Sequence, residues 1–80
     1  MVIVYTAADC GWCRLVKQYF DEKQVIYEEV DIFRHPERMG ELISKSLQMS
    51  VPVTDVNGTV VIGYNREALE RALQSHGLND

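Results

Sequence analysis

The sequence predicts an α/β fold in which three helices flank a mixed four-stranded sheet, in the order β-α-β-α-β-β-α. Short β-branched runs alternate with segments of helical periodicity in the first half of the chain. An Asn-Gly pair at 57–58 then separates two apolar runs, which indicates a tight hairpin. The first two strands, joined through a helix, are therefore expected to be parallel with a right-handed crossover, and the last two antiparallel.

The first half of the chain supplies two strands and two helices. Residues 2–5 are typical of a buried strand, and residues from about 11 to 23 have helical periodicity. A second strand is expected over 25–32, and Pro36 suits the first turn of a second helix. The apolar faces of the two helices are expected to consist of Leu15, Val16, Tyr19 and Phe20 in the first, and Met39, Leu42, Ile43 and Leu47 in the second.

The second half supplies the hairpin and the last helix. A third strand is expected to open at 51–53 and a fourth to return over 59–62. Asn65 is a suitable N-cap for the last helix, because its side-chain oxygen can accept from a free backbone N–H. Gly77 is expected to end that helix in a Schellman motif, with Leu78 packed back onto the apolar face formed by Leu69, Ala72 and Leu73.

Composition narrows the class of protein. The chain has 80 residues, with 8 basic and 12 acidic side chains and a net charge of −4, which predicts one globular domain over residues 1–80. An acidic chain lacks the basic surface that phosphate backbones require, so nucleic acid is not an expected partner. No stretch is apolar for long enough to span a membrane, and no secretory signal precedes Asp9. A cytoplasmic location is therefore expected, and the acidic residues around the second strand are interpreted as a solvated surface.

The two cysteines, Cys10 and Cys13, indicate redox chemistry. A disulfide across so short a loop would stabilise the fold little, so a structural role explains the pair poorly. A zinc site needs about four ligands. The spacing of the chain's two cysteines and two histidines fits no zinc finger. The pair is therefore interpreted as a thiol–disulfide centre.

The two cysteines are not equivalent in the predicted structure. Cys10 lies at the start of the first helix, where free N–H groups and the positive end of the helix dipole favour a thiolate and lower the thiol pKa. Arg14 and Lys17 are expected to add to that effect, and Asp9 to oppose it. Cys13 lies on the buried face of the helix, so we expect Cys10 to be the attacking nucleophile and Cys13 the resolving thiol.

Four marks along nearly the whole chain give it a resemblance to the glutaredoxin family of the thioredoxin-like fold. These marks are Val-Ile-Val-Tyr-Thr at 2–6, Cys-Gly-Trp-Cys at 10–13, Ser-Val-Pro at 50–52, and Gly63 before the last helix. The resemblance implies that Pro52 is cis and faces the cysteines. It also implies that the backbone of Val51 offers its N–H and C=O groups to an extended substrate. Trp12 is a candidate flat contact surface for a substrate peptide.

The sequence departs from ordinary glutaredoxins at both expected glutathione contacts. The family often has a lysine shortly before the first cysteine, where this chain has Ala-Ala-Asp at 7–9. The Gly-Gly-x-Asp-Asp of the family corresponds here to Gly-Tyr-Asn-Arg-Glu at 63–67. That start resembles short bacterial and archaeal redoxins, some of which feed ribonucleotide reductase and are recharged by thioredoxin reductase. Backbone N–H groups before the last helix could still hold a carboxylate, with Arg66 assisting. The candidate substrate-binding residues are Trp12, Arg14, Val51, Pro52, Gly63, Tyr64, Asn65 and Arg66.

The sequence therefore predicts a small dithiol oxidoreductase that reduces protein disulfides or glutathione mixed disulfides. No tightly bound cofactor or metal is expected, and either glutathione or thioredoxin reductase would supply the electrons. A monomer is expected. The alternative is a glutathione-dependent iron–sulfur carrier bridged between two chains, which Gly11 leaves open because it replaces a common proline.

Overall fold

The computed structural model describes residues 1–78. One four-stranded sheet has the order β2-β1-β3-β4, in which β1 is parallel to β2 and antiparallel to β3, and β4 is antiparallel to β3. The predicted element order and the mixed sheet are thus confirmed. The elements are β1 (Val2–Thr6), α1 (Gly11–Glu22), β2 (Glu28–Asp31), the short 3-10 helix η1 (Pro36–Arg38), α2 (Met39–Ser46), β3 (Val53–Val56), β4 (Thr59–Ile62) and α3 (Arg66–Ser75).

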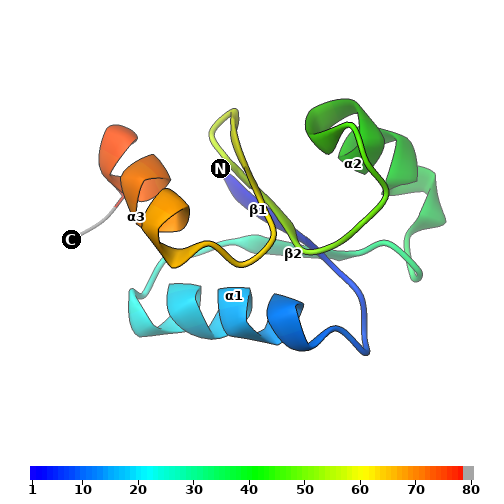
Figure 1. Cartoon of the computed structure of the whole chain (residues 1–80), viewed down its shortest axis with the longest axis horizontal. Helices are drawn as coiled ribbons and strands as arrows, with labels where there is room; N and C mark the ends of the chain where they lie inside the picture. Colours follow the sequence, from blue (N-terminus) through cyan, green and yellow to red (C-terminus); the bar gives the residue numbers. More distant parts are fainter. Residues whose placement is uncertain (79–80) are drawn as a thin grey trace.

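The helices cover opposite faces of the sheet. Figure 1 shows α1 along the lower side of the view and α2 at the upper right, with the strands between them. Successive side chains of a strand point to opposite faces, so Val4 packs with α1 and α3, whereas Tyr5 packs with α2. The core of the α1 and α3 face contains the large side chains Val16, Tyr19, Phe20, Leu69 and Leu73.

The second strand is shorter than the predicted 25–32. The chain leaves α1 through Gln24, whose φ is +58°, and the N–H of Val25 donates to the carbonyl of Phe20 at 3.0 Å. That N–H therefore completes the end of the helix instead of joining the sheet. The strand begins at Glu28 and ends at Asp31. One residue past that end, the N–H of Ile32 donates to the carbonyl of Thr6 at 3.1 Å.

The second helix also differs from its prediction. Pro36 occupies the first position of η1, and the α-helical turns begin only at Met39. Leu42 is fully buried as expected, but Leu47 is 87% exposed. Leu47 follows the last helical residue and has a left-handed backbone, with φ +61°, which takes its side chain off the apolar face. Ile43 is also more than a third exposed, so the buried stripe of this helix is narrower than its sequence indicates.

The third strand begins at Val53, two residues later than predicted. Val51 and Pro52 are joined by a cis peptide bond, as the resemblance implied, and proline has no N–H to donate to a ladder. The carbonyl of Pro52 instead accepts from the N–H of Gly63 at 2.8 Å. This segment is therefore a connection held against the end of β4.

Both predicted ends of the last helix are confirmed. The side chain of Asn65 accepts from the N–H of Ala68 at 3.0 Å. At the other end, Gly77 has φ +67° and the N–H of Leu78 donates to the carbonyl of Leu73 at 2.8 Å. That bond is the defining contact of a Schellman motif.

A polar network lies between α2 and the sheet. Tyr5 donates to Glu41 and accepts from Lys45 at 2.7 Å. Lys45 also pairs with Asp55 at 2.7 Å, and Arg38 contacts both oxygens of Glu41. Hydrogen bonds from Arg38 and Tyr5 lower the pKa of Glu41 to about 2. The fully buried Tyr5 ring is thus linked through its hydroxyl to the charged side of α2.

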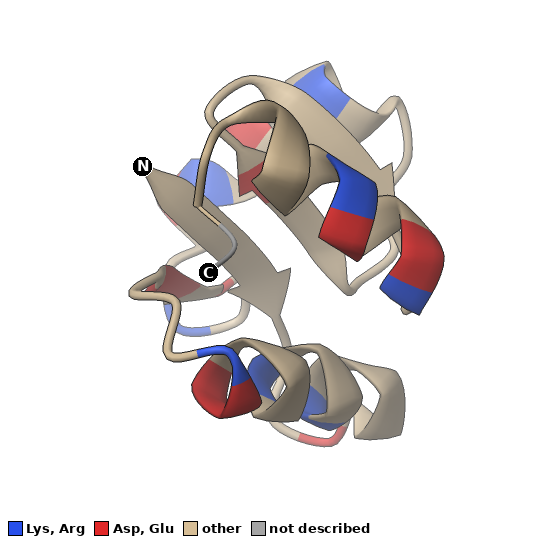
Figure 2. Cartoon of the chain, turned by 90° about the vertical axis from the view of Figure 1, so that its left-hand side faces the viewer, with Lys and Arg blue, Asp and Glu red and all other residues tan. Residues whose placement is uncertain are grey.

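The surface carries both signs of charge. Figure 2 shows Lys and Arg positions interspersed with Asp and Glu positions on the face turned toward the viewer. On α3 one such pair is Arg71 with Glu67 at 3.3 Å, one helical turn apart. Within residues 1–78, none of the helices has the length and apolar character needed to cross a membrane.

Candidate active site

The two cysteines lie at the start of α1, just after the loop that follows β1. Cys10 is the N-cap of α1, and its Sγ accepts from the N–H of Cys13 at 3.1 Å. The two residues form a disulfide, with their Cα atoms 5.2 Å apart. The sulfur of Cys10 thus occupies the position where a helix N-terminus favours negative charge, as expected from the sequence.

Burial separates the two sulfurs. Cys13 is fully buried on the inner face of α1, whereas Cys10 is partly exposed. The predicted asymmetry in exposure is therefore confirmed. Of the two residues, only Cys10 reaches solvent, and a nucleophile that meets an external disulfide must be accessible.

A shallow hollow of about 270 Å³ lies beside the disulfide. Its lining contains five of the eight predicted substrate-binding residues, namely Trp12, Val51, Pro52, Gly63 and Tyr64. The rings of Trp12 and Tyr64 are stacked, with centroids 6.2 Å apart and planes 24° apart. Trp12 remains 63% exposed, so the hollow has an aromatic rim that is accessible to a ligand.

Three segments far apart in the chain, one helical turn and two connections, build this hollow. Trp12 comes from the first turn of α1, Val51 and Pro52 precede β3, and Gly63 and Tyr64 follow β4. The hydrogen bond from Gly63 to Pro52 holds the last two connections together. Gly63 has φ +75°, a backbone conformation that a side chain with a Cβ would strain.

The other three predicted binding residues lie outside this lining. Arg14 is exposed, and within residues 1–78 no hydrogen bond or ion pair joins it to another side chain. Asn65 uses its side chain to cap α3. The guanidinium of Arg66 lies over the ring of Tyr19, 5.2 Å from the centroid. Their roles toward a substrate stay predictions.

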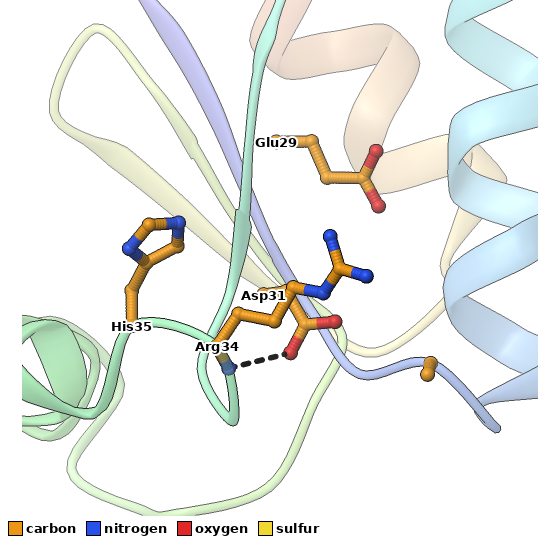
Figure 3. Close-up of a pocket in the computed structure, with 5 residues that line it drawn as sticks. Glu29, Asp31, Arg34 and His35 are labelled. Atoms are coloured by element: carbon orange, nitrogen blue, oxygen red, sulfur yellow. Dashed lines mark hydrogen bonds between the residues drawn. The ribbon is translucent and has the colours of Figure 1, made fainter.

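A second hollow, of about 280 Å³, is shown in Figure 3. Its lining is polar and consists of Ala8, Glu29, Asp31, Arg34 and His35. Ala8 precedes Cys10 by two residues, and β1 lies between β2 and β3 in the sheet. The polar hollow is therefore on the β2 side of the cysteine loop, whereas the aromatic hollow is on the β3 side.

Lys17 forms an ion pair that was not expected from the sequence, and its predicted effect on the Cys10 thiolate stays a prediction. Its Nζ lies 2.8 Å from Oε2 of Glu29, so its charge is compensated by a carboxylate. From the sequence, Glu29 was interpreted as part of a solvated acidic surface, so its contact with Lys17 beside the cysteine pair was not predicted. The missing signal was the parallel register, in which Glu29 pairs with Val4 and therefore faces α1.

Across the described part of the chain, no group of three or more His, Cys, Asp or Glu side chains is placed to hold a metal ion. The iron–sulfur alternative stays a prediction that rests on Gly11. The disulfide, the cis Pro52 and the aromatic hollow together define a thioredoxin-like redox site.

Comparison with known families agrees with this architecture. The family model described as Glutaredoxin matches residues 2–61, and the chain belongs to the glutaredoxin family. A curated glutaredoxin from Pseudomonas aeruginosa is 36% identical over 72 residues, which cover 89% of this chain and 86% of that protein.

Two solved structures are similar in fold. A thioredoxin-like protein superposes with a TM-score of 0.85 at 32% identity, covering 91% of this chain and 100% of that one. The glutaredoxin-like NrdH-redoxin from Escherichia coli has a TM-score of 0.78 at 21% identity, covering 88% of this chain and 91% of that one. The predicted thioredoxin-like glutaredoxin fold is therefore confirmed.

Proposed function

We propose that this protein is a dithiol thiol–disulfide oxidoreductase acting on protein disulfides or glutathione mixed disulfides. The observation that carries the proposal is the asymmetric pair at the start of α1. Cys10 is partly exposed at the helix N-cap, and Cys13 is fully buried behind it. The pair can therefore receive a substrate sulfur on one side and resolve the intermediate from the other.

In the proposed cycle, the Cys10 thiolate attacks one sulfur of a substrate disulfide. A Cys10–substrate bond forms, and the other substrate sulfur leaves as a thiolate and takes up a proton. Cys13 then loses its proton and attacks Sγ of Cys10, which breaks the mixed disulfide and releases the second substrate sulfur as a thiolate that also takes up a proton. The Cys10–Cys13 disulfide remains, which is the state of the pair in this structure. Two electrons and two protons have then passed to the substrate.

The aromatic hollow would hold the chain that flanks the substrate disulfide. Its rim presents Trp12 and Tyr64, and its floor contains the buried Pro52. Phe33, Leu47 and Met49 are exposed in connections at the same end of the sheet, since the carboxyl ends of β1 and β2 meet the amino end of β3 there. Exposed apolar side chains around a reactive site favour a protein substrate over a small thiol alone.

Serine variants of the two cysteines test the proposed roles. Cys10→Ser is expected to abolish turnover of a model protein disulfide, because no nucleophile remains at the exposed position. Cys13→Ser is expected to accumulate a mixed disulfide through Cys10, since nothing resolves it, and mass spectrometry would measure the adduct. The opposite pattern, with adducts in Cys10→Ser alone, would reverse the two roles.

The source of electrons is tested separately by following NADPH consumption on a model disulfide. One assay contains glutathione and its reductase, and the other contains thioredoxin reductase. Turnover only with glutathione would assign a glutathione-dependent cycle to the site beside Gly63. Turnover only with thioredoxin reductase would assign a thioredoxin-like cycle. Turnover with neither would contradict the proposed function.

A further inference from the structure

We propose that Glu29 is a positioning residue that sets the charge balance at the cysteine pair by neutralising Lys17. Without this carboxylate, α1 would place an uncompensated cation one turn from Cys13. The proposal deepens the proposed function and rests on it. It assigns the control of thiolate reactivity to a side chain on a strand that carries neither cysteine.

The carboxylate is held in place by two elements. Oε2 of Glu29 accepts from Nζ of Lys17 at 2.8 Å and from Oγ1 of Thr6 at 3.1 Å. Thr6 is the last residue of β1 and is only 1% exposed, so its hydroxyl is a fixed anchor. The acid is therefore fastened between the end of β1 and the second turn of α1.

This position is beside the redox pair. Lys17 follows Cys13 by four residues on the same face of α1, a spacing that brings Cβ atoms to about 5–6 Å. Glu29 and Ala8 line the same hollow, and Figure 3 shows the Glu29 carboxylate directed toward the α1 side of that hollow. Ala8 precedes Cys10 by two residues.

Other charges near the loop are exposed or already engaged. Asp9 and Arg14 are exposed, and within residues 1–78 no hydrogen bond or ion pair holds their side chains in place, unlike that of Glu29. Oδ1 of Asp31 accepts from the N–H groups of Phe33 and Arg34. In Figure 3 the guanidinium of Arg34 points toward the two carboxylates of β2.

The α3 helix, which packs on the same face as α1, places two charged groups near Tyr19. The guanidinium of Arg66 stacks over that ring. Burial and the negative charge of Glu70 raise the pKa of the Tyr19 hydroxyl. Tyr19 follows Cys13 by six residues, so these groups lie farther along α1 than the Lys17–Glu29 pair. The Lys17–Glu29 pair lies one helical turn from Cys13, and hydrogen bonds hold its carboxylate in place.

The direction of the effect follows from electrostatics. A cation stabilises a thiolate, and the thiolate is the reactive form of the reduced pair. Removing the negative charge of Glu29 would leave Lys17 uncompensated, raise the thiolate population and stabilise the reduced form. One elementary charge at about 10 Å in a partly solvated site changes such a population roughly two- to four-fold.

The test compares Glu29→Gln with Glu28→Gln. Glu28 is the neighbouring residue on β2, is 45% exposed where Glu29 is 43%, and pairs with Arg38 at 2.7 Å. It faces away from α1, so its variant has the same net charge without the local change. Thermal melts confirm that both variants fold.

Two readouts that need no partner protein are measured on each variant. One is the rate of Cys10 alkylation by iodoacetamide between pH 5 and 9, and the other is the dithiol–disulfide equilibrium in a dithiothreitol buffer. Glu29→Gln is expected to alkylate two- to four-fold faster at the lower pH values and to favour the reduced form by a similar factor. Glu28→Gln is expected to match the wild type, and Lys17→Gln to change both readouts in the opposite direction.

Equal changes in Glu29→Gln and Glu28→Gln would overturn the proposal, because net charge alone would then explain them. No change in Glu29→Gln would also overturn it. Because neither readout involves a substrate or a reductase, these results are separate from the turnover assays. Loss of turnover with both recharging systems would contradict the proposed function, whatever the alkylation rates.

Discussion

The two faces of the sheet hold their helices by different means. The α1 and α3 face buries large aliphatic and aromatic side chains, and Cys13 lies on its inner side. On the other face, α2 has only eight residues, and its buried residues are Leu42 and Ser46. There the network around Glu41 and Lys45 joins the helix to Tyr5 and Asp55. A short helix is marginal by itself, so buried Leu42, partly buried Met39 and a set of ion pairs supply its contact with the sheet.

The largest expected effect concerns the single leucine of α2. Leu42→Ala should lower the free energy of unfolding by about 2–5 kcal/mol, because it removes a fully buried side chain and leaves a cavity. Leu47→Ala is the matched control, since that leucine is 87% exposed, and it should change stability by less than about 0.5 kcal/mol. Urea denaturation measures both. If Leu42→Ala lowered the free energy of unfolding as little as Leu47→Ala, the ion pairs, and not Leu42, would hold α2 on the sheet.

A smaller effect is expected from the aromatic rim on the other face. Trp12→Ala should lower kcat/KM for a protein disulfide about tenfold, which corresponds to about 1.4 kcal/mol. Stability should stay near that of the wild type, because Trp12 is 63% exposed. Steady-state kinetics with a protein disulfide and with a small disulfide provide the comparison. A similar loss with both substrates would argue against a contact with the flanking chain.

The smallest effect concerns the pH dependence of the α2 network. The folded pKa of Glu41 is lowered from 4.5 to about 2, so its contribution is present above pH 4.5 and is lost as the pH falls toward 2. Glu41→Gln should therefore flatten the acid limb of the stability curve and cost at most about 1 kcal/mol at pH 7.

Glu67→Gln is the control for this acid limb, because Glu67 and Arg71 form a solvent-exposed pair. Denaturation midpoints between pH 2 and 7 measure both variants. An acid limb in Glu41→Gln as steep as in the wild type would show that other carboxylates cause it.

Local patterns predicted much of the fold and the chemical centre. Asn65, Gly77 and the Asn-Gly pair at 57–58 were each assigned correctly, because caps and tight turns depend on residues within a few positions of one another. The position of Cys10 at a helix start was predictable for the same reason. Errors arose at the ends of elements, as at Val25 and Leu47, where a helix-ending hydrogen bond or a left-handed backbone overrides the apolar pattern.

By itself the sequence determined the order of elements, the place of the Cys10–Cys13 pair and the burial of Cys13, since periodicity and spacing are local properties. Only the tertiary structure decided which side chains meet across elements. The parallel register turned Glu29 toward Lys17, and the bond from Gly63 to Pro52 helped to assemble the aromatic hollow from three separate segments. Contacts of this kind join residues more than ten positions apart, and their energies depend on a geometry that exists only after the sheet has formed.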